Sequence, residues 1–215
     1  MPAETGGISC CFDQVSQHML EDYRKEGLGS TSKAIADGLV QRGLAGATIL
    51  ELGCGVGALM LELLRKGAAS ATGFDLSPKM IQLARTLADE AGLSGSATFE
   101  VGDAAVNALK KSDMVILDAV LCCYPDVGGL VENSSSAATR YYAFTIPDDT
   151  RLTAMILKPL LPMQRLFMRR GGFRFFIHPS RKIARLLEAK GFRLVSKDSV
   201  GWIWSAFLFA APGAP

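Results

Sequence analysis

The stretch from Thr48 to Ala58 constrains the fold most, because an apolar strand pattern runs into three glycines at alternate positions. Gly53, Gly55 and Gly57 allow backbone conformations and close approaches that a Cβ atom would block. From Ala58 onward the residues favour a helix, whose free N–H groups would face a ligand at the loop. This order predicts a cradle for an adenosine-bearing cofactor, with a simple tight turn as the alternative.

Two classes of cofactor fit this loop. Gly53, Gly55 and Ala58 satisfy the dinucleotide fingerprint, so an NAD-type, nucleotide-dependent oxidoreductase is one hypothesis. Glu51, two residues before the first glycine, favours the other class. A carboxylate repels a pyrophosphate but attracts a cofactor that carries an ammonium and a sulfonium. Charge therefore favours S-adenosylmethionine, and the chain contains no Tyr-x-x-x-Lys pair for hydride transfer.

Three later strand patterns also end in an acid. Asp75 comes eighteen positions after Gly57, where an adjacent parallel strand would present a carboxylate to two ribose hydroxyls. Asp103 and Asp118 end the next two patterns. Strand and helix patterns alternate throughout, which predicts an α/β fold with a parallel sheet. Helix capping by Asp75, a loop position for Asp103 and a structural role for Asp118 remain alternatives.

Over residues 48 to 124 the chain resembles the class I S-adenosylmethionine-dependent methyltransferases. The motifs that carry the resemblance are Glu51 to Gly57, Phe74-Asp75, Gly102-Asp103 and Asp118 to Leu121. The resemblance implies a Rossmann-like sheet of seven strands in the order 3-2-1-4-5-7-6, with the last strand antiparallel. It also implies helices on both faces and an N-terminal helical cap.

The resemblance implies a role for each acid. Glu51 would reach the cofactor ammonium through water, Asp75 would hold the ribose, and Asp103 would accept from the adenine amino group. Asp118 would end its strand beside the transferable methyl group, and Tyr23 would close over the methionine end. The residues expected at the cofactor are Tyr23, Glu51, Gly53, Cys54, Gly55, Gly57, Asp75, Leu76, Met80, Asp103, Ala104 and Asp118.

The 215 residues are predicted to form a single methyltransferase domain. Its expected parts are a helical cap at 1–46, a cofactor-binding core at 47–146, a substrate lid at 147–182, and a C-terminal helix and hairpin at 183–215. The lid sequence mixes apolar and basic residues. Packing against the sheet and peripheral contact with a membrane are alternatives for that segment.

Composition and net charge limit the classes of binding partner that we expect. A net charge of +2 is too mild to indicate nucleic acid, so we expect a small-molecule acceptor and no nucleic acid. The first residues lack a signal-peptide pattern and no apolar run reaches transmembrane length, which predicts a cytoplasmic protein. The oligomeric state is left open.

His178 is the candidate catalytic base, because it could take a proton from the acceptor, with a position beside a helix cap as the alternative. His18 is a weaker candidate. The stretch Asp118 to Asp126, with Phe-x-x-His-Pro later in the chain, is similar over this short length to magnesium-protoporphyrin O-methyltransferases. The predicted reaction moves a methyl group from S-adenosylmethionine to a small molecule, slightly favouring oxygen, and leaves S-adenosylhomocysteine.

Five cysteines include two adjacent pairs, Cys10-Cys11 and Cys122-Cys123. Neighbouring thiols could serve a metalloid or thiol methyltransferase, which stays an alternative function. No Cys-x-x-Cys spacing occurs, so no metal site is predicted. A noncatalytic protein that keeps the cofactor-binding fold is the remaining alternative.

Overall fold

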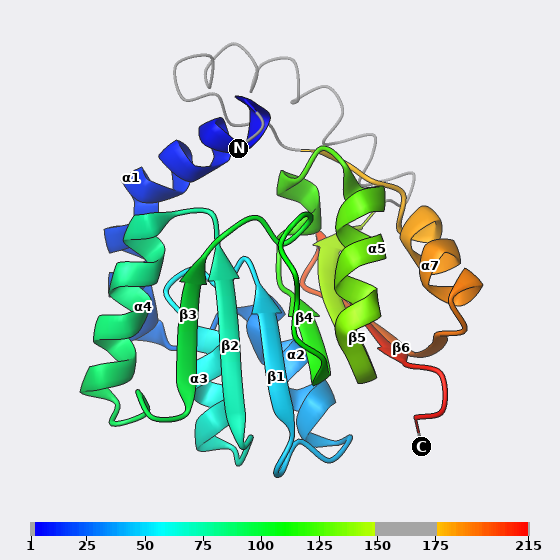
Figure 1. Ribbon diagram of the computed structural model, residues 1–215, viewed down its shortest axis with the longest axis horizontal. Helices are drawn as coiled ribbons and strands as arrows, with labels where there is room; N and C mark the ends of the chain where they lie inside the picture. Colours follow the sequence, from blue (N-terminus) through cyan, green and yellow to red (C-terminus); the bar gives the residue numbers. More distant parts are fainter. Residues whose placement is uncertain (1–2, 149–175, 215) are drawn as a thin grey trace.

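The computed structural model describes residues 3–148 and 176–214, which form one mixed sheet with helices on both faces (Figure 1). The strands are β1 (Thr48–Leu52), β2 (Ser70–Asp75), β3 (Ala97–Val101), β4 (Ser112–Leu117), β5 (Ala138–Pro147), β6 (Arg193–Val200) and β7 (Trp204–Ala210). The helices are α1 (Ala3–Glu26), α2 (Ser30–Val40), α3 (Ala58–Arg65), α4 (Pro78–Glu90), the 3-10 helix η1 (Leu121–Cys123), α5 (Val127–Ala137) and α7 (Ser180–Ala189).

The sheet order is β3-β2-β1-β4-β5-β7-β6, which confirms the predicted order. Strands β1 to β5 pair in parallel, with Leu52 opposite Phe74, and β7 pairs antiparallel with both β5 and β6. The carboxyl ends of parallel strands meet at one edge of the sheet. The loops after β1, β2, β3 and β4 therefore lie together at that edge, which faces upward in Figure 1.

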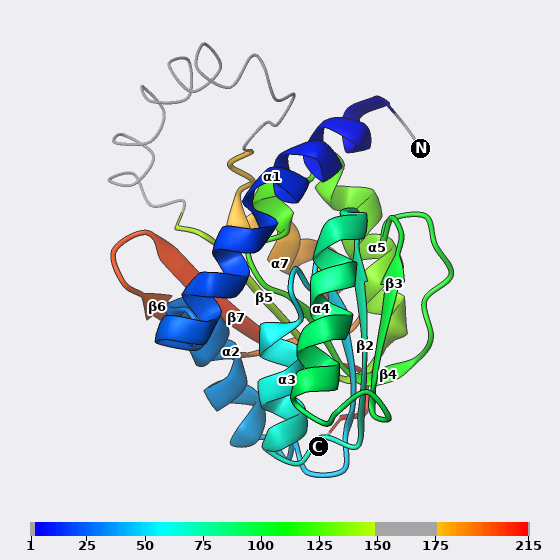
Figure 2. The ribbon, with the colours of Figure 1, turned by 90° about the vertical axis from the view of Figure 1, so that its left-hand side faces the viewer.

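Two apolar layers hold the helices to the sheet (Figure 2). Helices α2, α3 and α4 cover one face through fully buried side chains such as Leu39, Met60 and Met80. Helices α5 and α7 cover the other face, where Leu130 and Ile183 are buried. Because the central strands are buried on both sides, their sequences are almost continuously apolar.

Local sequence explains how α4 begins. Ser77 accepts a hydrogen bond from the Met80 amide, and Pro78 occupies the first turn, where its missing N–H costs nothing. This cap confirms the predicted start of the helix. It also fixes the turn that follows Asp75, at the edge where the strand-end loops meet.

The two helices of the predicted cap take different places. Helix α2 packs on the sheet face, with Ile35 and Leu39 in the core, whereas α1 extends beyond the carboxyl edge of the strands (Figure 1). Of the predicted lid, residues 149–175 lie outside the described residues, so the lid remains a prediction. The C-terminal helix and hairpin are present as α7, β6 and β7.

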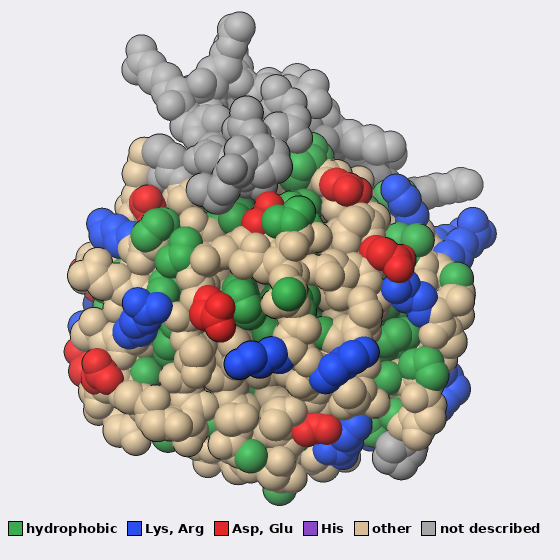
Figure 3. Space-filling view, viewed as in Figure 1, with side chains coloured by type: hydrophobic (Ala, Val, Ile, Leu, Met, Phe, Trp, Pro, Cys, Tyr) green, Lys and Arg blue, Asp and Glu red, His purple; other side chains and the backbone are tan. Residues whose placement is uncertain are grey.

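Charges of both signs are interspersed on the face seen in Figure 3. Within residues 3–148 and 176–214, no helix combines the length and the apolar character needed to cross a membrane.

Candidate cofactor site

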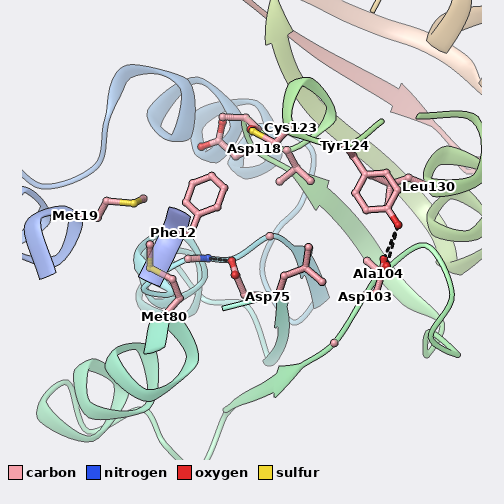
Figure 4. Close-up of a pocket in the computed structure, with 16 residues that line it drawn as sticks. Phe12, Met19, Asp75, Met80, Asp103, Ala104, Asp118, Cys123, Tyr124 and Leu130 are labelled. Carbon is pink, nitrogen blue, oxygen red and sulfur yellow. Dashed lines mark hydrogen bonds between the residues drawn. The ribbon is translucent and has the colours of Figure 1, made fainter. Parts of the chain in front are cut away.

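A pocket lies at the carboxyl edge of the sheet, between the strand-end loops and α1 (Figure 4). The predicted residues that line it are Gly53, Gly55, Asp75, Leu76, Met80, Asp103, Ala104 and Asp118. It also takes residues that were not predicted there, which are Phe12, Met19, Gly102, Ala119, Val120, Cys123, Tyr124 and Leu130. The wall is mostly apolar, with carboxylates set into it at separate points.

The glycine loop forms the floor of the pocket. Gly53 and Gly55 have φ angles of 71° and 53°, which favour glycine. A Cβ atom on Gly53 would lie 2.3 Å from Cγ2 of Val120, so the loop and the segment after β4 pack directly against each other. Gly57 differs from the prediction, because it caps α3 with a φ of 76° and its Cβ would meet the buried Phe99 ring at 2.7 Å. Gly57 therefore shapes the turn from below and does not line the pocket.

Glu51 lies beneath this loop and is only 3% exposed. Its Oε2 atom has no hydrogen-bond partner among the described residues. Burial raises the pKa of Glu51 well above its usual range, and the nearby charges of Asp118 and Asp75 raise it further. A buried carboxylate oxygen without a partner is costly unless a bound group or a water molecule satisfies it. Glu51 does not itself line the pocket, so it would reach the ammonium of a cofactor through a water molecule, as the resemblance implies.

The raised pKa of Glu51 predicts how the free protein responds to pH. Because the folded-state pKa exceeds the unfolded value, the free energy of unfolding falls as pH rises from the unfolded pKa toward the folded pKa. Glu51→Gln should remove this fall and stabilise the free protein by roughly 1–3 kcal/mol at pH 8, with a smaller gain at pH 5. Urea unfolding of the native protein and the variant at both pH values measures this difference in the free energy of unfolding.

The matched control is Glu132→Gln, at a glutamate that pairs with Lys190 at 2.6 Å and has a 67% exposed side chain. Its effect on the free energy of unfolding should be small at both pH values. A Glu51→Gln gain that is the same at pH 5 and pH 8 would contradict the assignment.

Asp75 is held in place by the loops on either side. Its Oδ2 accepts a hydrogen bond from the Gly55 amide at 2.9 Å (Figure 4). Its Oδ1 accepts one from the Ser77 amide at 2.8 Å. Burial raises the pKa of Asp75, against the lowering effect of these two hydrogen bonds. Each carboxylate oxygen has more than one acceptor site, so this orientation leaves room for two further donors. Such a carboxylate suits a pair of vicinal hydroxyls.

Asp103 is also buried, at 5% exposure. Its Oδ1 accepts the Ala105 amide at 3.0 Å, which fixes the turn after β3. The hydroxyl of Tyr124 donates to both carboxylate oxygens, at 2.8 and 2.9 Å (Figure 4). This contact with Tyr124 was not predicted from the sequence.

Asp118 stands at the end of β4, on the pocket wall. Thr145 of β5 donates to its Oδ1 at 2.6 Å, and the hydroxyls of Ser32 and Thr31 donate to its Oδ2, Thr31 at 3.4 Å. Ser32 and Thr31 belong to the first turn of α2, where free N–H groups favour a negative charge. Asp118 is thus both a pocket residue and a tie between α2 and β5.

Tyr23 was predicted to lie at the cofactor, but other residues of α1 line the pocket. The Tyr23 hydroxyl donates to Glu62 and accepts from Arg65, each at 2.9 Å, so it ties α1 to α3 and does not line the pocket. Phe12 and Met19 line it instead. Tyr23 lies on the turn beyond Met19, and its partners on α3 hold it there.

Neither histidine lines the pocket within the described residues. His178 places Nε2 at 2.9 Å from the Tyr124 carbonyl, and its ring stacks on Phe176. Because a carbonyl only accepts, Nε2 must be the donor, which leaves Nδ1 as the basic nitrogen. Burial lowers the pKa of His178. His18 is on the surface beside Asp22, at 3.4 Å.

Three cysteines are described, and all are free. Cys54 is buried in the core, where burial raises its pKa, and it does not line the pocket. The sulfur atoms of Cys122 and Cys123 lie 3.7 Å apart, and both contact the Ala119 carbonyl. Only Cys123 reaches the pocket wall. Among the described residues, no group of three His, Cys, Asp or Glu side chains is arranged to hold a metal ion.

We compared the chain with known protein families, curated proteins and solved structures. Residues 49–140 match the methyltransferase domain family. A magnesium-protoporphyrin O-methyltransferase from Rhodobacter capsulatus is 32% identical over 56% of this chain and 54% of its own. A ribosomal protein L11 methyltransferase from Edwardsiella ictaluri is 33% identical over 45% of this chain and 36% of its own. The chain therefore spans about half of the first of these two relatives and about a third of the second.

A solved structure shares the fold over the whole chain. Magnesium protoporphyrin IX methyltransferase from Synechocystis PCC 6803, with bound SAM, superposes with a TM-score of 0.74 at 21% identity and covers 98% of each chain. Fold and site thus define an α/β domain that binds an adenosine-bearing cofactor. With the family match, they show that residues 49–140 belong to a methyltransferase domain of the class I type, and they support S-adenosylmethionine as its cofactor.

Proposed function

We propose that the protein transfers a methyl group from S-adenosylmethionine to an oxygen atom of a small molecule. The observation that carries the proposal is the unpartnered, buried carboxylate oxygen of Glu51 beneath a glycine floor. Glu51 would hold the ammonium, Asp75 the ribose hydroxyls and Asp103 the adenine amino group. Met80 and Leu76 would supply apolar contacts to the base.

The chain has little covalent chemistry to perform. When bound, S-adenosylmethionine supplies a methyl group that its sulfonium already activates. Phe12 and Met19 would exclude water from the methyl end, and Asp118 would orient the acceptor by accepting a hydrogen bond from its hydroxyl. The three hydroxyl donors on Asp118 hold its carboxylate in one orientation for that task.

Two observations support a small molecule with an oxygen acceptor. The Rhodobacter capsulatus relative is named as an O-methyltransferase that acts on a porphyrin, whereas the relative named for a ribosomal protein matches a smaller share of this chain. The pocket wall is mostly apolar and α1 lies over it, which suits a compact apolar acceptor better than a protein chain. Hydrophobic carboxylic acids and phenols are the first acceptors to test.

The first experiment is titration calorimetry with S-adenosylmethionine, S-adenosylhomocysteine and NAD in parallel. Binding of the first two and no binding of NAD supports the proposal, and binding of NAD alone or of nothing contradicts it. An acceptor screen that measures S-adenosylhomocysteine formation follows, with arsenite and small thiols beside the oxygen acceptors. Turnover only with arsenite or thiols would favour chemistry at Cys123, which lines the pocket.

We also propose that His178 positions the segment after β4 by holding the Tyr124 carbonyl. His178→Gln retains a donor and should keep turnover within about threefold of the native rate, whereas His178→Ala should lower it about tenfold through one lost hydrogen bond. Steady-state kinetics measure both. If the two variants lose turnover equally and by far more, His178 acts as a proton acceptor, as the sequence suggested.

A further inference from the structure

We propose that Tyr124 is a gate for the adenine base: its hydroxyl occupies the Asp103 carboxylate in the free protein and leaves it when the base binds. This inference rests on the proposed use of Asp103 for the adenine amino group. The same carboxylate would then serve two donors in turn, one from the protein and one from the cofactor.

The hydroxyl of Tyr124 occupies the Asp103 carboxylate in the free protein. The phenol hydroxyl donates to both oxygens of Asp103, at 2.8 and 2.9 Å, and the carboxylate is only 5% exposed (Figure 4). Tyr124 and Asp103 both line the pocket, so the carboxylate that the phenol occupies belongs to the wall that an adenine base would contact. Burial and the negative charge of Asp103 raise the pKa of Tyr124, which keeps the phenol protonated and able to donate. An incoming amino group would compete with this hydroxyl for the carboxylate.

The acid is fixed and the tyrosine side chain is the part that can move. Asp103 accepts the amide of Ala105, and the side chain of Asn133 donates to the carbonyls of Ala104 and Asn107, at 2.7 and 2.9 Å. These bonds tie the turn after β3 to α5. Among the described residues, the phenol of Tyr124 supplies the only hydrogen bonds from the segment after η1 to this turn, and rotation about its side-chain bonds frees the acid.

The main chain of Tyr124 is anchored on its far side. Its carbonyl contacts His178 at 2.9 Å, and the Phe176 amide donates to the neighbouring Cys122 carbonyl at 2.6 Å. These two contacts hold the backbone while the side chain rotates. Removing the hydroxyl should therefore release the acid without displacing the segment.

The test compares three proteins, native, Tyr124→Phe and Tyr142→Phe, by calorimetry with two ligands. Tyr142 is a matched control, because it is fully buried, it does not line the pocket, and its hydroxyl hydrogen-bonds to Ser134. The ligands are S-adenosylhomocysteine and its purine analogue, which lacks the amino group. We expect Tyr124→Phe to bind S-adenosylhomocysteine three- to tenfold more tightly and the purine analogue within twofold of native, with Tyr142→Phe unchanged for both.

An equal change for both ligands, or weaker binding of S-adenosylhomocysteine by Tyr124→Phe, would overturn the gate. Failure of the native protein to bind S-adenosylhomocysteine would overturn the proposed function and the gate with it. A second measurement on the native protein does not depend on the variant folding. Tyrosine absorbance should shift when S-adenosylhomocysteine binds and stay constant with the purine analogue, and the same spectrum with both ligands would contradict the gate.

Discussion

Asp75→Asn should lower the affinity for S-adenosylhomocysteine by at least about thirtyfold, or about 2 kcal/mol, because the charged acceptor that we propose for two ribose hydroxyls becomes an amide. The NH2 group of the new asparagine also faces the backbone N–H of either Gly55 or Ser77, each of which donates a hydrogen bond to the native carboxylate. One of these two hydrogen bonds is therefore lost, and the loop around Asp75 loosens. Titration calorimetry measures the affinity. Thermal unfolding of the free variant separates loss of binding from loss of fold.

Asp113→Asn is the matched control, since Asp113 is another acid of the sheet that accepts backbone and side-chain bonds, both from Thr48. It lies near the start of β4, at the edge opposite the pocket. Hydrogen bonding lowers the pKa of Asp113, so its loss should reduce stability and leave ligand affinity unchanged. Unchanged affinity in Asp75→Asn would remove Asp75 from the ribose site.

Gly53→Ala should lower the free energy of unfolding by about 2–4 kcal/mol. The φ of 71° costs a non-glycine residue about 1 kcal/mol, and the new Cβ would lie 2.3 Å from Cγ2 of Val120, an overlap worth about 1–3 kcal/mol. The floor of the pocket must shift to relieve that overlap, so affinity for S-adenosylhomocysteine should fall as well. Urea unfolding and calorimetry measure the two effects.

Gly46→Ala isolates the backbone strain. Gly46 has a φ of 73°, but a Cβ there would meet no atom within 4 Å, so the loss should be only about 1 kcal/mol, with no effect on binding. Gly53→Ala combined with Val120→Ala should recover part of the stability by removing the colliding methyl groups. Equal losses for Gly46→Ala and Gly53→Ala would show that the contact with Val120 is unimportant.

The alternation of strands and helices could be predicted because the information is local and repeated, since each strand of the cofactor half runs into an acid or a glycine. The order of all seven strands came from the resemblance, and the structure confirms it. The strand ends also predicted most of the acids around the pocket, since parallel strands must bring their carboxyl ends together. Asp75, Asp103 and Asp118 all line the pocket for that reason.

The residues of α1 that lie over the pocket could not be predicted in the same way. Phe12, Met19 and Tyr23 recur at helical spacing, but spacing does not tell which member faces a cavity and which faces another helix. The bonds from Tyr23 to Glu62 and Arg65 decided this, and they join positions about forty residues apart. The contact between Tyr124 and Asp103 is equally non-local, because it depends on how the loops after β3 and β4 approach each other.

Helix α1 is attached to the body mainly by side chains. Asp13 accepts from Ser77, Arg24 pairs with Glu90, and Phe12 packs against the core. Among the described residues, all those that line the pocket, apart from the two on α1, lie between positions 53 and 130. In evolutionary terms, α1 and the part of the pocket between residues 53 and 130 can diverge separately. A descendant can alter what it admits by changing one helix at the start of the chain, while the inherited cofactor chemistry stays intact.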